Sequence, residues 1–383
     1  MAIKNRNKFR LTRFVIFKVS RIFKILSSIR TSERRLLVIK LDAIGDYVLF
    51  RNYLEVLTSA NKYKGYKIDV LGNIQWKDIA VKFDSKHVSE FIFTDAENLY
   101  EKPIHTLKLG YKLFKKNYEV VLQPTYSRTL IANGLCGLAA AKESIAYNNP
   151  TEKRKYKKRT DKFYTSLLTL PETIFHELER HLYFFKQVLD DESIQLKGPL
   201  FPVSKTESKG IVLFPGSSFH KRNWEKKRFL EIIKRLLLHT SEPIIIAGGP
   251  LETELASYLI DNLPEGSNVI NKAGKLGLVD FISMVANSKL LITNETSAVH
   301  IAASCQTKSI CILGGGHFNR FTPYPEAINY ELSCVYYEMP CFNCDWVCKF
   351  ITEPDDPFPC ISNIDIENVW SEVVQAIYSD KLL

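Results

Sequence analysis

The chain of 383 residues is long enough for about two domains, since a domain commonly holds roughly 150 residues. Hydrophobic residues make up 45% of it and charged residues 25%, a composition that excludes a disordered, collagen-like or coiled-coil protein. No apolar run approaches the roughly 18 to 20 residues that a membrane-spanning helix needs.

The net charge of +10 is concentrated at the amino terminus, where residues 1–35 hold eleven Lys or Arg and one acid. Phe and Ile recur among these cations at three-to-four-residue spacing, which predicts a basic amphipathic helix on a membrane surface. A helix packed on its own protein and an RNA-binding tail are the alternatives. Because the rest of the chain is neutral and a signal-peptide pattern is lacking, we expect no nucleic-acid partner and a cytoplasmic protein, peripheral on the inner face of the cytoplasmic membrane.

The first half of the chain alternates apolar strands with helical or polar stretches. Strands are expected at 36–41, 68–71, 91–93 and 120–122, and helices at 47–57 and 174–189. This βαβ rhythm is typical of an open parallel sheet. Residues 153–159 predict an exposed basic loop, and the polar stretch near 190–208 predicts a domain boundary.

The same rhythm restarts in the second half. Strands are expected at 211–214, 244–247, 268–270, 290–293 and 309–313, and helices at 225–238, 250–261, 278–287, 297–304 and 365–379. The simplest architecture is α/β, with two doubly wound Rossmann-like domains that face each other across a cleft. In such domains ligands lie beyond the carboxyl ends of the strands, at helix N-termini. We therefore expect a basic arm (1–35), two domains (36–195 and 208–362) and a C-terminal helix (363–383).

The first motif that holds a candidate catalytic residue, residues 42–46, follows the first strand. Gly45 allows a tight turn, and Asp46 falls at the start of a helix, where a carboxylate can deprotonate an acceptor hydroxyl. The alternative is that Asp46 is a helix N-cap, a position that Asp favours.

The second motif, residues 214–224, also joins a strand to a helix. Its amides, hydroxyls and cations can hold a phosphate, although the Walker pattern is absent. The residues concerned are Ser217, Ser218, Lys221 and Arg222. The alternative is a basic surface turn.

Two further turns suit a ribose or a phosphate. The glycine pair at 248–249 permits close approach of a ligand, and Glu252 can accept ribose hydroxyls, although Gly-Gly-Pro is also ordinary turn chemistry. In residues 292–300, Glu295 can meet ribose, and the amides of Thr296 and Ser297 can meet phosphate. His300 lies one turn further on, and a lone His is more often structural.

Taken together, these motifs resemble glycosyltransferase family 9, the heptosyltransferases that build the lipopolysaccharide inner core. The resemblance runs from about Leu36 to the C-terminus. The motifs that carry it are Ala43-Ile44-Gly45-Asp46, Pro215-Gly216-Ser217-Ser218 with Arg222-Asn223-Trp224, Gly248-Gly249-Pro250-Leu251-Glu252, Ala273-Gly274-Lys275-Leu276-Gly277-Leu278 and Asn294-Glu295-Thr296-Ser297-Ala298-Val299-His300. Residues 176–177 also look like the family's mid-chain segment.

The resemblance implies a GT-B fold whose last helix, in many members, crosses back to the first domain. It implies inverting transfer of a sugar, typically heptose from ADP-heptose, to a lipopolysaccharide core or related glycolipid, with a nucleotide sugar as co-substrate and no required cofactor. Asp46 matches the family's proposed general base. The donor-binding matches are Ser217, Ser218, Lys221, Arg222, Glu252, Leu276, Glu295, Thr296, Ser297 and His300.

Three single residues and one loop depart from the family pattern. Arg222 and Glu295 replace the usual Lys and Asp, Ser297 replaces Gly, and residues 314–317 replace a common Gly-Pro-Thr. All of them belong to the expected donor pocket. An altered donor, a nucleotide-sugar epimerase and a non-catalytic nucleotide- or glycan-binding relative are therefore kept as alternatives.

Two clusters lie outside these motifs. The first is the basic segment, in which Lys153, Arg154, Lys157 and Lys158 are candidates for holding an anionic glycolipid acceptor, with a solvated charged face as the alternative. The second consists of Cys341, Cys344, Cys348 and Cys360, whose spacing can supply four thiolates to a structural metal. Redox-active thiols or a disulfide are a second interpretation, and plain reduced thiols are the favoured one in a reducing compartment.

Overall fold

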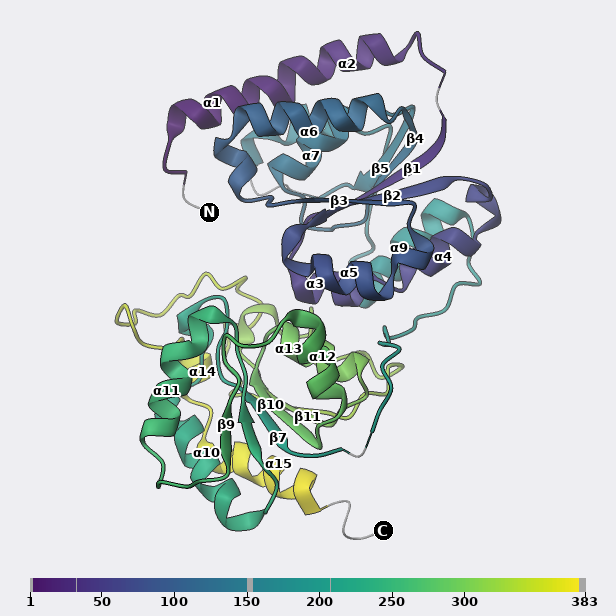
Figure 1. Ribbon diagram of the computed structural model, residues 1–383. Helices are drawn as coiled ribbons and strands as arrows, with labels where there is room; N and C mark the ends of the chain where they lie inside the picture. The colour runs from purple at the N-terminus through teal and green to yellow at the C-terminus, as the bar shows by residue number, and fades with distance from the viewer. Residues whose placement is uncertain (1–2, 32, 150–153, 207, 379–383) are drawn as a thin grey trace. The chain divides into compact units, whose positions relative to one another are not determined.

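The computed structural model describes residues 3–31, 33–149, 154–206 and 208–378. The chain forms two compact units, Met1–Leu196 and Lys197–Leu383, each built on a six-stranded parallel sheet (Figure 1). The expected α/β class, with two doubly wound domains, is confirmed.

The sheet of unit 1 has the strand order β3-β2-β1-β4-β5-β6. Its two central strands are buried on both faces, which explains why they appear in the sequence as continuous apolar runs. The strands are β1 (Glu33–Lys40), β2 (Lys67–Asn73), β3 (Glu90–Thr94), β4 (Tyr118–Gln123), β5 (Glu143–Tyr147) and β6 (Ser166–Leu168).

Helices cover both faces of this sheet (Figure 1). One face carries α6 (Pro103–Lys115) and α7 (Leu130–Ala139). The other carries α3 (Ile44–Phe50), α4 (Tyr53–Ser59), α5 (Lys77–Phe83) and α9 (Glu177–Leu189). The single helix expected at 47–57 is in fact the pair α3 and α4.

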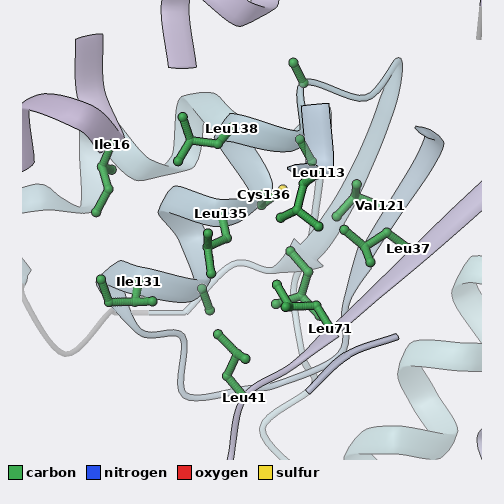
Figure 2. Close-up of a cluster of buried hydrophobic side chains, with 14 of the residues drawn as sticks. Ile16, Leu37, Leu41, Leu71, Leu113, Val121, Ile131, Leu135, Cys136 and Leu138 are labelled. Carbon is green, nitrogen blue, oxygen red and sulfur yellow. The ribbon is translucent and has the colours of Figure 1, made fainter. Parts of the chain in front are cut away.

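The basic amino-terminal segment is a helix that belongs to unit 1. It consists of α1 (Arg6–Phe14), a π-helical turn (Val15–Val19) and α2 (Ser20–Ser27), and it lies along α6 and α7. Ile16 is fully buried and lies over Gly134, where a Cβ would come within 2.6 Å of the Ile16 side chain. Figure 2 shows Ile16 beside the core side chains of α7. The basic segment 1–35 therefore packs on its own protein, as one of the alternatives expected, because part of its apolar residues complete the core of unit 1.

The basic segment after β5 is not the loop that was expected. It forms a 3-10 turn (Arg154–Tyr156), α8 (Lys157–Thr160) and a second 3-10 turn (Asp161–Phe163). Tyr156 is buried against Phe17, and its hydroxyl accepts a hydrogen bond of 2.6 Å from Arg13. Contact with the amino-terminal helix thus orders this segment. Lys153 lies outside the described residues.

Unit 2 repeats the topology with the order β12-β11-β10-β7-β8-β9. Its strands are β7 (Ile211–Phe214), β8 (Ile244–Ile246), β9 (Val269–Asn271), β10 (Leu290–Asn294), β11 (Ser309–Ile312) and β12 (Leu332–Val335). Its helices are α10 (Lys226–His239), α11 (Thr253–Asp261), α12 (Leu278–Ala286), α13 (Ser297–Ser304), α14 (Pro359–Ser362) and α15 (Ile366–Tyr378).

The final helix belongs to unit 2. Val369 and Val373 of α15 are fully buried in the unit 2 core, where α15 contacts α10, β11 and β12. Over Ile366–Tyr378 the helix therefore packs in unit 2, and residues 379–383 lie outside the described chain. That the last helix crosses back to the first domain stays a prediction.

Each sheet reverses its strand order at one point, between β1 and β4 in unit 1 and between β7 and β10 in unit 2. At such a switch point the flanking connections leave toward opposite faces, and ligands bind outside the carboxyl ends of the strands. The candidate residues that follow β1, β7 and β10 therefore lie where this fold binds ligands.

Candidate active site

Asp46 lies at the switch point of unit 1. The N-cap of α3 is Ala43, so Asp46 is the third residue of the helix rather than its cap. The N-cap alternative is therefore wrong. The Asp46 side chain is half-exposed in the first turn, where the positive end of the helix dipole favours a carboxylate.

A buried polar network fixes the turn that precedes Asp46. Lys40, at the end of β1, is 2% exposed, and its Nζ lies 2.8 Å from Asp42 Oδ2. Thr125, which follows β4, donates a 2.6 Å hydrogen bond to the same oxygen and so bridges the switch point. Trp76 Nε1 and Asn73 Nδ2 donate to the backbone carbonyls of Asp42 and Leu41. Sequence reasoning missed this network, although the Lys-x-Asp pair at the end of β1 signals it.

Carboxylates near Lys40 offset the cost of burying its cation. Desolvation works against the cation, but the carboxylates of Asp42, Asp46 and Glu177 outweigh it, so the pKa of Lys40 is raised. His181 Nε2 lies 3.5 Å from Lys40 Nζ, and burial, aided by that cation, lowers the pKa of His181 to about 3. His181 is therefore neutral at physiological pH.

The segment at 176–177 begins α9. His176 is the N-cap and accepts a 3.1 Å hydrogen bond from the Leu178 amide. Glu177 pairs with Arg180 at 2.6 Å in a buried site, and the Arg180 guanidinium lies 4.1 Å from the Tyr126 ring centroid. These contacts join α9 to the loop after β4.

Candidate acceptor cations of the basic segment differ in their surroundings. Lys157 is committed to Asp161 at 2.6 Å and to Asn148 at 2.9 Å. Arg154 and Lys158 are exposed. Lys157 is therefore the least suited of these three to hold an external anion.

In unit 2, the side chain of Asn294 bonds to the loop after β7 at the switch point. Its Nδ2 donates to the Pro215 carbonyl at 2.6 Å, and its Oδ1 accepts from the Trp224 amide at 3.0 Å. Thr293 Oγ1 also donates to the Phe214 carbonyl at 3.0 Å. The end of β10 thereby holds both ends of the loop after β7.

Arg222 and Glu295 meet beside this loop. Arg222 donates a 2.8 Å hydrogen bond to the Glu295 carbonyl, and its Nη2 lies 3.8 Å from Glu295 Oε2. Glu295 is 6% exposed, and no described residue donates a hydrogen bond to Oε2. Burial raises the pKa of Glu295 to about 7, against the opposing effect of Arg222 and Arg320. This carboxyl group therefore titrates near neutral pH.

Trp346 is a site residue that the sequence did not indicate. The Arg222 guanidinium lies 4.6 Å from its ring centroid. The ring also packs on Gly316, where a Cβ would come within 2.3 Å of it. The departure from Gly-Pro-Thr at 314–317 thus provides room for this ring.

The glycines of the second and third motifs make room for Glu252. A Cβ on Gly216 would lie 2.2 Å from Glu252 Cγ, and one on Gly248 would lie 2.5 Å from Glu252 Cβ. The Gly274 amide donates to the Gly248 carbonyl at 2.9 Å, which brings the turn containing half-exposed Leu276 to the same edge. The loops after β7, β8 and β9 therefore converge.

The remaining donor candidates fall into two groups. Ser217, Ser218, Thr296 and Ser297 lie at the loop ends, where Thr296 caps α13 by accepting from the Ala298 amide and Ser217 Oγ donates to the Phe219 carbonyl. Lys221 and His300 are engaged elsewhere. Lys221 donates to Thr352 Oγ1 and the Glu353 carbonyl, and His300 is 5% exposed with Nδ1 2.7 Å from the Tyr324 hydroxyl. Arg222 is therefore the cation of the pair that faces Glu295.

The four clustered cysteines line one small apolar cavity with Trp346 and Phe358. Among the described residues, no group of three or more His, Cys, Asp or Glu side chains is arranged to hold a metal ion. Burial raises the pKa of the Cys360 thiol to about 11 and also raises that of Cys344. The interpretations as reduced thiols, redox-active thiols or metal ligands stay predictions. Nor does any described helix have the length and apolarity to cross a membrane.

The comparisons with known proteins agree with these motifs. The model of the family described as glycosyltransferase family 9 (heptosyltransferase) matches residues 139–349, more than half of the chain. The chain belongs to this family.

Two curated relatives, both lipooligosaccharide heptosyltransferase 2 of Campylobacter jejuni, are 24% and 25% identical to this chain over 214 and 183 residues. The matches cover 52% and 43% of the chain and 63% and 55% of the relatives. The chain thus spans less than two thirds of the length of the relatives it matches.

Solved structures of family 9 members share the fold. ADP-heptose LPS heptosyltransferase II of E. coli superposes with a TM-score of 0.68 at 16% identity, over 91% of this chain and 99% of that one. A family 9 glycosyltransferase of Veillonella parvula gives 0.69 at 15% identity, over 92% and 99%. E. coli heptosyltransferase WaaC, solved with ADP-2-deoxy-2-fluoro heptose, gives 0.63 at 17% identity, over 89% and 99%. The expected GT-B fold is thereby established.

Proposed function

We propose that this family 9 protein is an inverting glycosyltransferase that moves heptose from ADP-heptose to a lipopolysaccharide core or related glycolipid. The observation that carries the proposal is the convergence of three loops at the carboxyl edge of the unit 2 sheet, with Arg222 and Glu252 among them. The names of its relatives point to the same donor, because WaaC was solved with a fluoro analogue of ADP-heptose.

Unit 2 supplies the donor site in this proposal. As the bond between the anomeric carbon and the phosphate oxygen breaks, negative charge grows on the departing diphosphate. Loop amides near Gly216, the Arg222 guanidinium and the N-terminus of α13 stabilise that charge more in the transition state than in the ground state. Glu252 and Glu295 accept hydrogen bonds from the ribose hydroxyls.

Unit 1 supplies the base. Asp46 accepts the proton of the acceptor hydroxyl while the oxygen of that hydroxyl forms the new bond to the anomeric carbon. ADP leaves with the electrons of the broken bond. Support comes from the fixed turn and from the buried Lys40, whose charge favours ionised Asp46. The proposed reaction uses no metal or other cofactor, and the Arg222 guanidinium balances the charge that develops on the diphosphate.

An epimerase is the alternative that a specific observation favours. A putative UDP-N-acetylglucosamine 2-epimerase of Listeria monocytogenes superposes with a TM-score of 0.54 at 11% identity. A non-catalytic nucleotide or glycan binder is a further alternative, favoured by the altered residues around Glu295.

We also propose that the protein acts in the cytoplasm, peripheral on the membrane that holds its acceptor. The outer side of the amino-terminal helix supports this location, because it exposes apolar and cationic side chains together. The apolar ones are Leu11, Phe14, Ile22, Ile25, Leu26 and Ile29. An amphipathic helix of this kind binds anionic lipid surfaces.

The test combines donor binding with turnover. We expect ADP and ADP-heptose to raise the melting temperature of the chain, and UDP, GDP and CMP sugars to raise it less, because a ligand that binds only the native state stabilises it. With a heptose-deficient glycolipid, wild-type protein should release ADP and form product. A preference for UDP sugars with UDP-N-acetylglucosamine turnover would support the epimerase, and ADP binding without transfer would support the non-catalytic binder.

A further inference from the structure

Unit 1 contains a cavity between the amino-terminal helix, the end of α7 and the segment that leads into β6. Its volume is about 180 Å³. We call it the helix pocket. Its principal lining residues are Phe17, Arg21, Lys24, Cys136, Arg159 and Phe163.

The helix pocket lies at the opposite end of the sheet from Asp46. Its lining residues Ala141 and Thr165 come just before β5 and β6, whereas Asp42 and Asp46 follow the carboxyl end of β1. All six strands are parallel, so these are opposite edges of the sheet, separated by about 20 Å at roughly 3.3 Å per residue. The helix pocket is therefore distinct from the proposed site of transfer.

The mouth of the helix pocket is strongly cationic. Arg21, Lys24, Arg159 and Lys162 line it, all four with exposed side chains, and Lys24 Nζ donates a 2.8 Å hydrogen bond to the Ala141 carbonyl. No carboxylate is found among its described lining residues. The acid next in sequence, Asp161, is already paired with Arg128 and Lys157, each at 2.6 Å. Four cations without local acids favour an anionic group at this mouth.

The floor of the helix pocket is apolar. Phe17 and Phe163 stack with ring centroids 5.9 Å apart, and the Arg159 guanidinium covers Phe17 at 3.6 Å. Cys136, labelled on α7 in Figure 2, is buried, and burial raises the pKa of its thiol to about 12, so it is a neutral wall. Dry cavities of about 150 Å³ accept a benzene molecule, so this volume suffices for a short hydrocarbon segment.

Exposed apolar side chains border the helix pocket. Arg21 and Lys24 are interleaved along α2 with Ile22 and Ile25, which are 55% and 71% exposed. An interfacial helix that carries both kinds of side chain brings the mouth of the cavity to headgroup level.

We propose that the helix pocket binds one anionic phospholipid, with its phosphate among Arg21, Lys24, Arg159 and Lys162 and the start of an acyl chain against Phe17 and Phe163. The bound lipid holds the amino-terminal helix on unit 1 and fixes how that unit meets the membrane. This inference goes beyond sugar transfer and does not depend on the donor.

The test uses short-chain lipids as monomers and calorimetry on the full chain. We expect dihexanoyl phosphatidylglycerol to bind with a stoichiometry of one. Dihexanoyl phosphatidylcholine and inorganic phosphate should each bind about tenfold more weakly, since the first lacks the net charge and the second lacks the chains. The double variant Arg21→Glu/Lys162→Glu should weaken phosphatidylglycerol binding by about tenfold or more.

The matched control is Lys82→Glu/Lys86→Glu, which makes the same charge change at exposed positions in and just after α5. It should bind phosphatidylglycerol as the wild type does. Equal weakening in both double variants would overturn the proposal in favour of non-specific attraction. Equal binding of phosphate would reduce the helix pocket to an anion site, and absence of phosphatidylglycerol binding would refute it. The ADP-dependent melting shift, measured on the same samples, tests the proposed transferase separately.

Discussion

The two units share one topology but treat charge differently at their switch points. In unit 1, the carboxylates near β1 face a buried cation, Lys40, and Asp42 is further held by Thr125. In unit 2, Glu295 is buried with one oxygen that receives no hydrogen bond from any described residue, and its pKa is about 7. The buried cation of the first switch point is thus paired with carboxylates, whereas the second has a buried carboxyl oxygen that a ligand can satisfy. This difference suits our proposal, in which unit 1 holds a base that must be fixed before the acceptor arrives and unit 2 holds a site that the nucleotide completes.

The largest expected effect comes from Asp46→Asn, which removes the base without changing its shape. Transfer should fall by about 10²- to 10⁴-fold, the usual contribution of a general base. The ADP-dependent melting shift should persist, because the nucleotide binds to unit 2 in our proposal. Heptose transfer and the melting shift, measured together, check this prediction, and transfer at wild-type rates would rule Asp46 out as the base.

Lys40→Met should destabilise unit 1 by about 3 kcal/mol at pH 7, because removing one member of a buried charge cluster leaves the others uncompensated. The Lys40 charge interacts favourably with the Asp46 carboxylate, so its loss should move the acid limb of the rate profile to higher pH. Urea unfolding and the pH dependence of kcat/KM provide the two measurements.

Lys40→Arg, which keeps the charge, is the control for that experiment. It should restore the pH profile more fully than it restores stability, since the larger guanidinium must fit a site that is 2% exposed. An unshifted acid limb in Lys40→Met would show that Lys40 only supports the fold.

These two predictions differ in how far the sequence alone leads to them. The turn with Asp46 was predicted because a strand, a glycine and a carboxylate follow one another within a few residues. The network of Lys40, Thr125 and His181 was not, since its contacts join residues 83 and 141 positions apart that only the folded sheet brings together. Periodicity found β7 at its observed bounds, but it missed β5, β12 and α7. The last is buried over its whole length and so lacks an amphipathic stripe.

The amino-terminal helix illustrates the same limit. Its composition predicted an amphipathic helix correctly, but composition does not reveal that Gly134 leaves room for Ile16. Among the donor candidates, Ser217, Glu252 and Glu295 were correctly expected at strand ends. The different orientations of Lys221 and Arg222 depend on Thr352 and Trp346, which are more than 100 residues away.

Gly216→Ala tests the packing of the donor loops. The new methyl group would overlap Glu252, so either the loop or the Glu252 side chain must move, at a cost of about 1 to 3 kcal/mol. ADP should bind about tenfold more weakly or worse, as judged by calorimetry. In the double variant Gly216→Ala/Glu252→Ala the overlap is removed, and stability should recover. If the single variant binds ADP normally, these loops do not form the nucleotide site.

Glu295→Gln gives the smallest effect and the sharpest contrast with unit 1. The folded-state pKa of about 7 lies above the unfolded value of 4.5, so the native state holds its proton more tightly and loses stability as pH rises from about 4.5 to 7. Glutamine keeps the shape without the ionisation. At pH 8 the unfolding free energy of the variant should therefore exceed that of wild type by about 2 kcal/mol, which gives a higher melting temperature. At pH 4.5 the two proteins should differ little. Asp42→Asn should instead lower the stability, because it removes the carboxylate that faces the buried Lys40. Melting curves of both variants at the two pH values make the comparison. If Glu295→Gln has no advantage at pH 8, then Arg222 already compensates the buried carboxylate. The charges at the second switch point would then be paired as those at the first are.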